Sequence, residues 1–197
     1  MNFVIILCIV GAYLIGSVSP AYIYYKKLTG KDIRKAGDKN PGSANIRQLA
    51  GASPAFVIAL IDFCKGILPL LVAKKLGVSD FYLIFVAVAA VAGHDWPLFL
   101  GFRGGKGTLT SLGVMVFYLP FETILAFIVW LFIHYIIKTR FIGSLITFVL
   151  IPILTWFISV RWLGNPVYYL LLPLIILVFF SANMSENISN FFKTKKN

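Results

Sequence analysis

Residues that could bind phosphate gather in a short loop that is rich in glycine and basic side chains. The loop covers Gly101–Gly107, and Lys106 stands in it between glycines, shortly before an apolar segment. Glycine lets a backbone approach a phosphate closely, and the N-terminus of a following helix adds positive potential. The loop is not a Walker A motif, because its spacing is one residue short and no βα unit surrounds it. The composition of this loop favours a phosphate-binding loop, called here a phosphate cradle. The alternative is a loop whose lysines bind lipid.

A longer basic loop, between residues 30 and 51, has a composition that suits anion binding. It contains further glycines, two asparagines and five basic residues. Such a loop can turn several backbone N–H groups toward one point, as in an anion-binding nest. Arg34, Lys39 and Arg47 could supply the charge. The alternative is a flexible basic loop that lies on anionic lipid.

Four polar side chains within or beside apolar runs need an explanation. Asp62 and Lys65 lie one helical turn apart, so they can pair within one helix. They either face a polar interior, or Lys65 snorkels from a helix end while Asp62 pairs with it. His94 could act as a general base or could orient substrate or pack. His134 lies on an apolar face, which favours packing.

The elements that must hold these residues are membrane helices. Of the 197 residues 59% are hydrophobic and only 13% are charged, whereas soluble domains have about 25% charged residues. With a mean hydropathy of +0.89, this composition excludes a soluble domain, a coiled coil and a disordered chain. Continuous apolar runs favour helices over a β-barrel. We expect an all-α integral membrane protein with one polytopic domain over residues 1–197.

Seven apolar segments are predicted, with Pro120 dividing a run that is too long for one span. They cover about Asn2–Tyr25, Ala52–Ala73, Asp80–Leu100, Leu109–Leu119, Phe121–Ile137, Phe141–Val160 and Pro166–Ala182. The fourth segment is short and would cross only about half the bilayer. No basic residue precedes the first segment, so we expect a retained helix and not a cleaved signal peptide.

The distribution of charge predicts the orientation. With the break at Pro120, 14 basic residues fall on the inner side and 3 on the outer side; without it the numbers are 10 and 7. The positive-inside rule therefore predicts seven segments, with the N-terminus outside and the C-terminus cytoplasmic. The same rule explains the net charge of +11 without nucleic acid, and anionic lipid or an anionic substrate is the second explanation. Cys8 and Cys64 have no disulfide or metal spacing, which favours packing.

Together these motifs resemble the bacterial membrane acyl-phosphate:glycerol-3-phosphate acyltransferases, and the resemblance covers most of the chain. That family also has seven segments with the N-terminus outside. The residues that carry the resemblance are Gly16-Ser17 and Pro20 at the end of the first span, Asp32-Ile33-Arg34, the stretch from Gly37 through Asn40-Pro41-Gly42-Ser43-Ala44-Asn45 to Arg47, Asp62-x-x-Lys65-Gly66, Gly93-His94-x-Trp96-Pro97-x-Phe99, Phe102-Arg103-Gly104-Gly105-Lys106-Gly107 and Glu186-Asn187-Ile188.

Three departures from the family pattern identify this chain as a divergent member. Asp38-Lys39 stands where the family has Ser-Gly. Gly143 stands where the family has a serine, with Ser144 one place later, and Met184-Ser185 replaces a His-Arg pair. All three places are associated with substrate contacts in the family.

The resemblance implies that a fatty acyl group passes from acyl phosphate to glycerol 3-phosphate, giving lysophosphatidic acid for phospholipid synthesis. An acyl phosphate is already activated, so no metal, cofactor or covalent nucleophile is required, and positioning and charge neutralisation could suffice. The expected partners are glycerol 3-phosphate, acyl phosphate, membrane lipid and the soluble enzyme that makes acyl phosphate. The expected location is the bacterial inner membrane, with the active site on the cytoplasmic side.

The resemblance also implies roles for individual residues. His94, Lys106 and Asn187 are expected to be catalytic, and Asp62 and Lys65 to support the site. The expected substrate-binding residues are Ser17, Arg34, Gly37, Asn40, Gly42, Ser43, Asn45, Arg47, Arg103, Gly104, Gly105 and Gly107. The competing functions are a membrane transporter or a lipid-binding protein for a phosphorylated solute.

Overall fold

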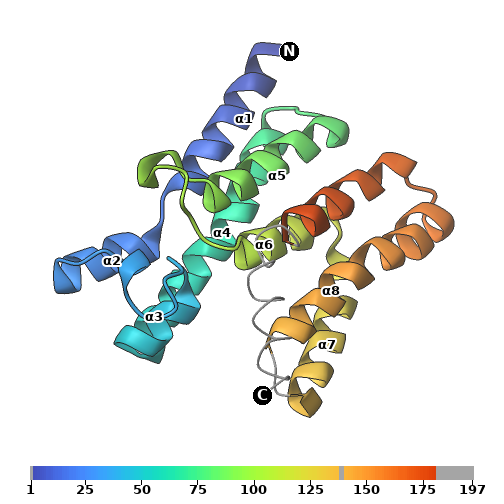
Figure 1. Cartoon of the computed structure of the whole chain (residues 1–197). Helices are drawn as coiled ribbons and strands as arrows, with labels where there is room; N and C mark the ends of the chain where they lie inside the picture. The colour runs from blue at the N-terminus through green and yellow to red at the C-terminus, as the bar shows by residue number, and fades with distance from the viewer. Residues whose placement is uncertain (1, 138–139, 181–197) are drawn as a thin grey trace. The chain divides into compact units, whose positions relative to one another are not determined.

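The computed structural model describes residues 2–137 and 140–180, and every regular element within them is a helix (Figure 1). The chain divides into two compact units, residues 1–114 and 115–197. Each unit has its own packing.

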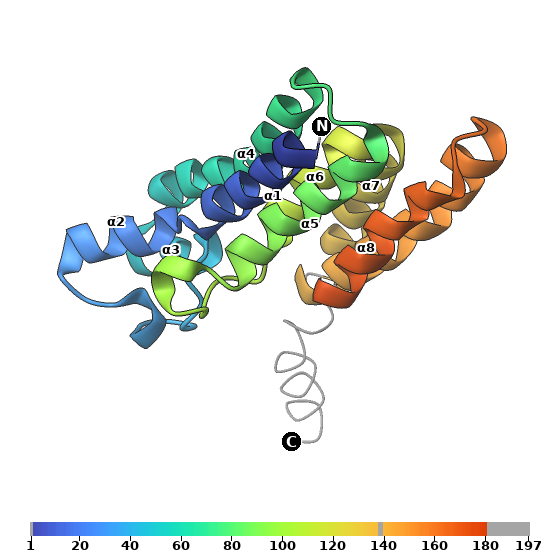
Figure 2. The same cartoon turned by 90° about the horizontal axis from the view of Figure 1, so that it is seen from above.

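Three long helices form the centre of the first unit. α1 and α5 lie side by side with α4 against them, and the shorter α2 and α3 lie beyond one end of α1 (Figures 1 and 2). α6 carries the chain from the first unit into the second. The helices of this part are α1 (Asn2–Ser17), α2 (Pro20–Thr29), η1 (Ile33–Lys35), α3 (Ser43–Ala50), α4 (Ala52–Lys75), α5 (Asp80–Asp95), η2 (Leu98–Leu100) and α6 (Thr108–Tyr118).

The first apolar run consists of two helices, so the prediction of one uninterrupted helix over Asn2–Tyr25 was wrong, although Phe3–Thr29 remains one candidate membrane span. α1 ends at Ser17, and α2 begins with Pro20. The Ser19 hydroxyl caps α2 by accepting from the Tyr22 N–H at 3.2 Å. Proline fits the first position of a helix, where its missing N–H has no partner to lose. The apolar composition continues through the break and hides it.

Glycines allow two pairs of helices in this unit to touch through their backbones. A Cβ at Gly16 of α1 would clash with the carbonyl of Ala90 on α5, and one at Gly93 would clash with the carbonyl of Tyr13. Gly66 of α4 lies in the same way against α6. Small residues at helix crossings are typical of membrane helices, because close backbone approach maximises van der Waals contact.

The second unit begins with the helix break that the sequence predicted. α6 ends at Tyr118 and α7 starts at Pro120, which confirms a break at this proline. α7 packs against α8, where Trp130 fills the space beside Gly143. The buried Glu122 carboxylate accepts a hydrogen bond from the Ser159 hydroxyl. The elements are α7 (Pro120–Ile137), α8 (Arg140–Thr155), the π-helix η3 (Trp156–Trp162) and the 3-10 helix η4 (Val167–Leu170), which opens the apolar helix Val167–Phe180.

Four helical stretches among the described residues are long and apolar enough to cross a bilayer, and three are shorter. The predicted segment Asp80–Leu100 is α5 followed by η2, and Phe141–Val160 is α8 continued by the π-helix. α6 has 11 residues, so the predicted fourth segment is indeed short. The long stretches are Phe3–Thr29, Ala52–Lys75, Asp80–Leu100 and Gly143–Trp162, and the shorter ones are Thr108–Tyr118, Pro120–Ile133 and Val167–Phe180.

Candidate active site

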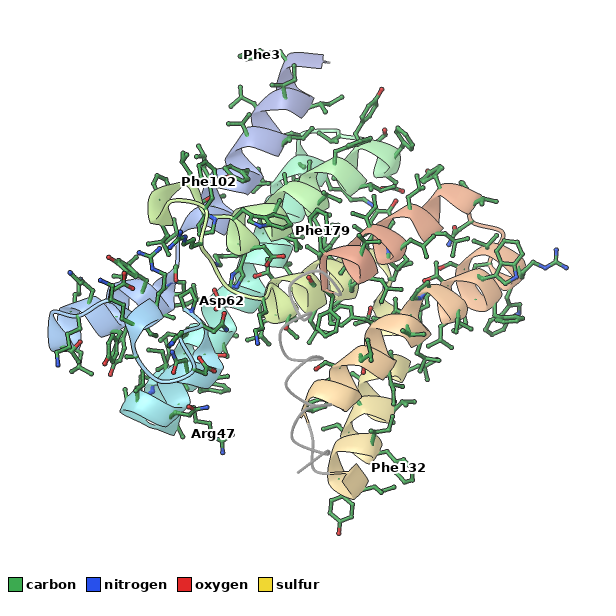
Figure 3. The ribbon with its side chains drawn as sticks, in the orientation of Figure 1. Phe3, Arg47, Asp62, Phe102, Phe132 and Phe179 are labelled. Carbon is green, nitrogen blue, oxygen red and sulfur yellow. The ribbon has the colours of Figure 1, made fainter. Side chains whose placement is uncertain are left out.

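A buried cluster of three polar side chains lies inside the first unit, where Figure 3 labels Asp62. Asp62 and Lys65 come from α4 and His94 comes from the end of α5, with exposed fractions of 2%, 5% and 9%. The Lys65 ammonium lies 2.9 Å from the Asp62 carboxylate and 3.3 Å from His94 Nδ1. Lys65 therefore does not snorkel to a surface. Of the two predicted alternatives, the structure has the one in which Asp62 and Lys65 face a polar interior.

Lys65 also holds the end of α1. Its ammonium donates to the carbonyls of Gly16 and Val18, at 3.2 and 2.7 Å. The last carbonyls of a helix have no partner within that helix, and they carry the negative end of its dipole. The ammonium satisfies both needs at the point where Pro20 begins a new helix. Lys65 thus fastens α1 to α4 and α5.

The ring nitrogen Nδ1 of His94 has two polar neighbours in the cluster. It lies 3.3 Å from the Lys65 ammonium and 3.6 Å from the Asp62 carboxylate. The three N–H groups of the ammonium have closer partners in Asp62 and in the carbonyls of Gly16 and Val18, so the contact with Lys65 does not fix the tautomer of His94. The other nitrogen, Nε2, faces Gly105, where an added Cβ would clash with it. His94 therefore presents Nε2 to the glycine-rich loop.

The glycine-rich loop packs directly on the end of α5. The amides of Gly104 and Gly105 donate to the carbonyls of Asp95 and His94, both at 3.1 Å. A Cβ at Gly104 would clash with the His94 carbonyl, and one at Gly107 would clash with the Asp95 carboxylate. These glycines are needed so that the loop can approach the protein itself. The amides of Gly104 and Gly105 therefore already have partners in the protein, and the predicted phosphate site would have to use Lys106 and the N-terminus of α6.

The first basic loop is shaped by the side chain of Asn45. This buried amide donates to the carbonyls of Ala36 and Asn40, at 3.0 and 3.1 Å, and accepts from the Asp38 N–H at 3.1 Å. Gly37 has a φ of 58°, and a Cβ there would clash with Asn45. Asn45 and Gly37 therefore shape the turn. The three hydrogen bonds of the Asn45 side-chain amide are all made to backbone groups of this turn and not to a ligand.

The two loops meet at a cleft of about 310 Å³. Four cations and one carboxylate line it, so the cleft suits an anion. The lining residues are Asp32, Arg34, Lys35, Lys39, Pro41, Arg103 and Gly104.

Arg34 joins the loops on one side of this cleft. Its guanidinium pairs with the Asp32 carboxylate at 2.8 Å and donates to the Leu100 carbonyl at 2.6 Å. It also lies over the ring of Tyr22, 5.5 Å from the centroid. The hydrogen bond from Arg34 lowers the pKa of Asp32, and Asp32 in turn raises the pKa of Arg34. Both groups stay charged, which keeps the guanidinium in place.

The first unit thus combines a buried Asp62–Lys65–His94 cluster with two basic loops that meet at a cleft. A family model described as glycerol-3-phosphate acyltransferase matches residues 6–194. The chain belongs to this family. Two similar relatives are the glycerol-3-phosphate acyltransferases of Desulforamulus reducens, 38% identical over 148 residues, and of Shouchella clausii, 41% identical over 143 residues. These matches cover 75% and 72% of this chain and 74% and 70% of those proteins.

Two crystal structures share the fold. They show PlsY (YgiH), described as an integral membrane glycerol 3-phosphate acyltransferase, in a glycerol 3-phosphate form and a lysophosphatidic acid form. The TM-scores are 0.86 and 0.84, the identities are 30% and 29%, and both matches cover 96% of this chain and 92% of the other. The chain is therefore an all-helical, multi-pass integral membrane acyltransferase.

Not all residues expected to bind substrate in this acyltransferase line the cleft. The buried Ser17 hydroxyl donates to the Tyr13 carbonyl at 2.8 Å and accepts from the Leu98 N–H at 3.3 Å. Arg47 is exposed on α3 and projects outward in Figure 3, apart from the cleft. Lys106 is half-buried between glycines that pack on His94 and Asp95.

Other expected residues shape the start of α3 or lie beyond the described part. Asn40 and Gly42 form the turn before Ser43, the first residue of α3, and the Gly42 amide donates to the Asn40 carbonyl at 2.9 Å. Asn187, Met184 and Ser185 lie outside the described residues, as does the side chain of His134.

Of the residues that line the cleft, Asp32, Lys35, Lys39 and Pro41 were not among the expected substrate-binding residues, although Lys39 had been named as a possible source of charge. Lys35 could have been predicted as a cleft residue because it directly follows Arg34. No local feature of the sequence shows that Arg103 lines the same cleft. Within residues 2–137 and 140–180, no group of three or more His, Cys, Asp or Glu residues could hold a metal ion.

Proposed function

We propose that this membrane glycerol-3-phosphate acyltransferase takes its acyl group from an acyl phosphate and transfers it to the 1-hydroxyl of glycerol 3-phosphate. The products are lysophosphatidic acid and inorganic phosphate. The observation that carries this proposal is the cleft at which two cationic loops meet, in a chain of this family. Both substrates bear a phosphate group, so both would gain from those cations.

The proposed chemistry needs little more than positioning and charge. The hydroxyl oxygen attacks the acyl carbon, a new ester C–O bond forms, and the C–O bond to phosphate breaks. The phosphate leaves with the bonding electrons. A mixed anhydride has a good leaving group, so the barrier can be lowered by holding the two substrates together and neutralising the phosphate charge.

In this proposal Lys106 and the N-terminus of α6 stabilise phosphate charge as it develops. Lys106 holds the acceptor phosphate and Asn187 orients it, whereas the exposed Arg47 does not line the cleft and has no contact in this arrangement. His94, whose Nε2 faces the glycine-rich loop, donates a hydrogen bond from that nitrogen to a substrate phosphate. The proton of the attacking hydroxyl then goes to a phosphate oxygen of a substrate. Asp62 and Lys65 keep His94 and the end of α1 in position.

The proposed arrangement in the membrane has seven segments, with the N-terminus outside and the C-terminus and active site at the cytoplasmic side of the inner membrane. The distribution of basic residues supports this orientation. The whole chain acts as one catalytic domain that needs no cofactor. A soluble enzyme that makes acyl phosphate supplies the donor from the cytoplasm.

The test uses purified protein in lipid vesicles with acyl phosphate and glycerol 3-phosphate. We expect inorganic phosphate and lysophosphatidic acid to be released in equal amounts, and neither to form when glycerol 3-phosphate is left out. A transporter or a lipid-binding protein would bind a phosphorylated solute without releasing either product. That result would contradict the proposed function.

A further inference from the structure

Lys39 has a left-handed backbone conformation, which is energetically unfavourable for a residue that has a Cβ. Its φ is 63°, and among the described residues only Lys39 and Phe102 are non-glycine residues with positive φ. The left-handed conformation brings Cβ close to the following carbonyl oxygen, so it costs free energy in every L-residue with a side chain, whereas glycine adopts it freely.

The surrounding turn imposes this conformation. The Lys39 N–H donates to the Ala36 carbonyl at 3.0 Å, and the Asn40 N–H donates to the Asp38 carboxylate at 3.0 Å. Asn45 holds the turn from inside through its three hydrogen bonds. The turn would therefore keep its shape with glycine at position 39. The presence of a lysine at position 39 must therefore be explained by what its side chain contacts.

That side chain lines the cleft between the loops. Arg34, Lys35 and Arg103 line it too, and Asp32 is already paired with Arg34. Within the described part of the chain, no carboxylate forms an ion pair with Lys35, Lys39 or Arg103. Cations gathered in one cleft repel each other, and an anion that enters the cleft relieves this repulsion.

We propose that Lys39 is a further phosphate-binding residue, whose ammonium contacts the phosphate group of a substrate in this cleft and sets the affinity for it. The ligand class is a phosphate monoester or acyl phosphate, and the two sources are glycerol 3-phosphate and the acyl donor. The inference rests on the proposed function for the identity of these substrates. The part of the inference that concerns phosphate binding rests on the cleft alone.

The test compares four variants of the full-length protein in discs of uncharged lipid. Lys39→Asn removes the charge and keeps a residue that tolerates positive φ. Lys39→Gly removes the charge and relieves the backbone, and Lys39→Arg restores the charge. Lys31→Asn is the matched control, because Lys31 is an exposed lysine of the same loop that does not line the cleft.

Calorimetry with inorganic phosphate measures binding without turnover. We expect the Kd to rise about fivefold in Lys39→Asn and Lys39→Gly, as for the loss of one solvent-screened charge. Lys39→Arg and Lys31→Asn should stay within about twofold of the parent protein. The unfolding temperature of Lys39→Gly should not fall, so weaker binding in that variant would not come from a damaged fold.

Kinetics then identify the substrate. A rise in KM for glycerol 3-phosphate, with kcat unchanged, assigns Lys39 to the acceptor, and a rise for acyl phosphate assigns it to the donor. The inference is overturned if neither KM changes, if the parent protein binds no phosphate, or if Lys31→Asn weakens binding as much as Lys39→Asn. Normal phosphate binding without acyl transfer would instead contradict the proposed function and leave this inference standing.

Discussion

At the scale of single residues, one buried ammonium connects three helices. Lys65 contacts a carboxylate on its own helix, an imidazole on α5 and two carbonyls at the end of α1. The charge of Asp62 balances it, so the cluster can lie at membrane depth. Lys65 is the member on which the others depend, because its loss leaves the Asp62 carboxylate without its ammonium and the carbonyls of Gly16 and Val18 without their donor.

The first prediction concerns this dependence. Lys65→Met leaves the Asp62 carboxylate buried without its ammonium, so we expect a loss of about 3–5 kcal/mol in the free energy of unfolding. Thermal unfolding in detergent, followed by circular dichroism, measures the change. Adding Asp62→Asn to Lys65→Met should recover part of the loss. A Lys65→Met protein that unfolds at the parent temperature would show that the cluster contributes nothing to stability.

The second prediction concerns Lys106. Lys106→Ala removes the charge beside the N-terminus of α6 and leaves the loop backbone in place. We expect acyl transfer to fall about a hundredfold, which corresponds to roughly 3 kcal/mol of electrostatic stabilisation. Lys106→Arg should rescue only in part, because a planar guanidinium presents its donors differently. Lys27→Ala is the control, since Lys27 is exposed on α2; an equal loss in that variant would contradict a local role for Lys106.

At the scale of helices, glycines decide how closely the elements of the first unit can pack. Gly16 and Gly93 bring α1 and α5 into backbone contact, and the end of α5 carries His94 and supports the glycine-rich loop. The position of the loop therefore depends on a helix crossing within the unit.

The third prediction compares two glycines of the same helix. A Cβ at Gly16 would clash with the Ala90 backbone, whereas one at Gly11 would meet nothing within 4 Å. We expect Gly16→Ala to lower the free energy of unfolding by about 1–3 kcal/mol. Gly11→Ala should be neutral or slightly stabilising, because alanine is the better helix former. Equal effects of the two substitutions on the thermal unfolding midpoint would contradict the proposed crossing.

The sequence predicted the helix boundary at Pro120 but not the one at Pro20, although a proline is the local signal at both. Pro120 interrupts an apolar run, and a break lies there. Ser19-Pro20 is the same kind of signal in the first run, but the apolar residues on both sides concealed it. The partners of Lys65 could not be predicted, because the carbonyls it binds lie 47 and 49 residues earlier in the chain. The glycines of the second loop were predicted to let the backbone approach a phosphate, but Gly104 and Gly105 approach the end of α5.

At the scale of the whole molecule, the distribution of basic residues is the physical basis for orientation. The fourth prediction is that a tag after Asn197 and a tag in the loop around Lys39 are both reached only from the cytoplasm. A tag between Lys75 and Asp80 should be reached only from outside. Protease protection in sealed membrane vesicles measures this. A C-terminal tag on the outer side would contradict the seven-segment arrangement and favour six spans.

The central claim, that the donor is an acyl phosphate, is tested most directly by a comparison of donors in one preparation. Purified protein in lipid vesicles receives glycerol 3-phosphate with either acyl phosphate or the acyl-CoA of the same chain length, and formation of lysophosphatidic acid is measured. We predict product with acyl phosphate and none above background with acyl-CoA. The physical reason is that a thioester lacks a phosphate next to the reacting carbon, where the cationic loops would hold it. Equal rates with the two donors would contradict this account.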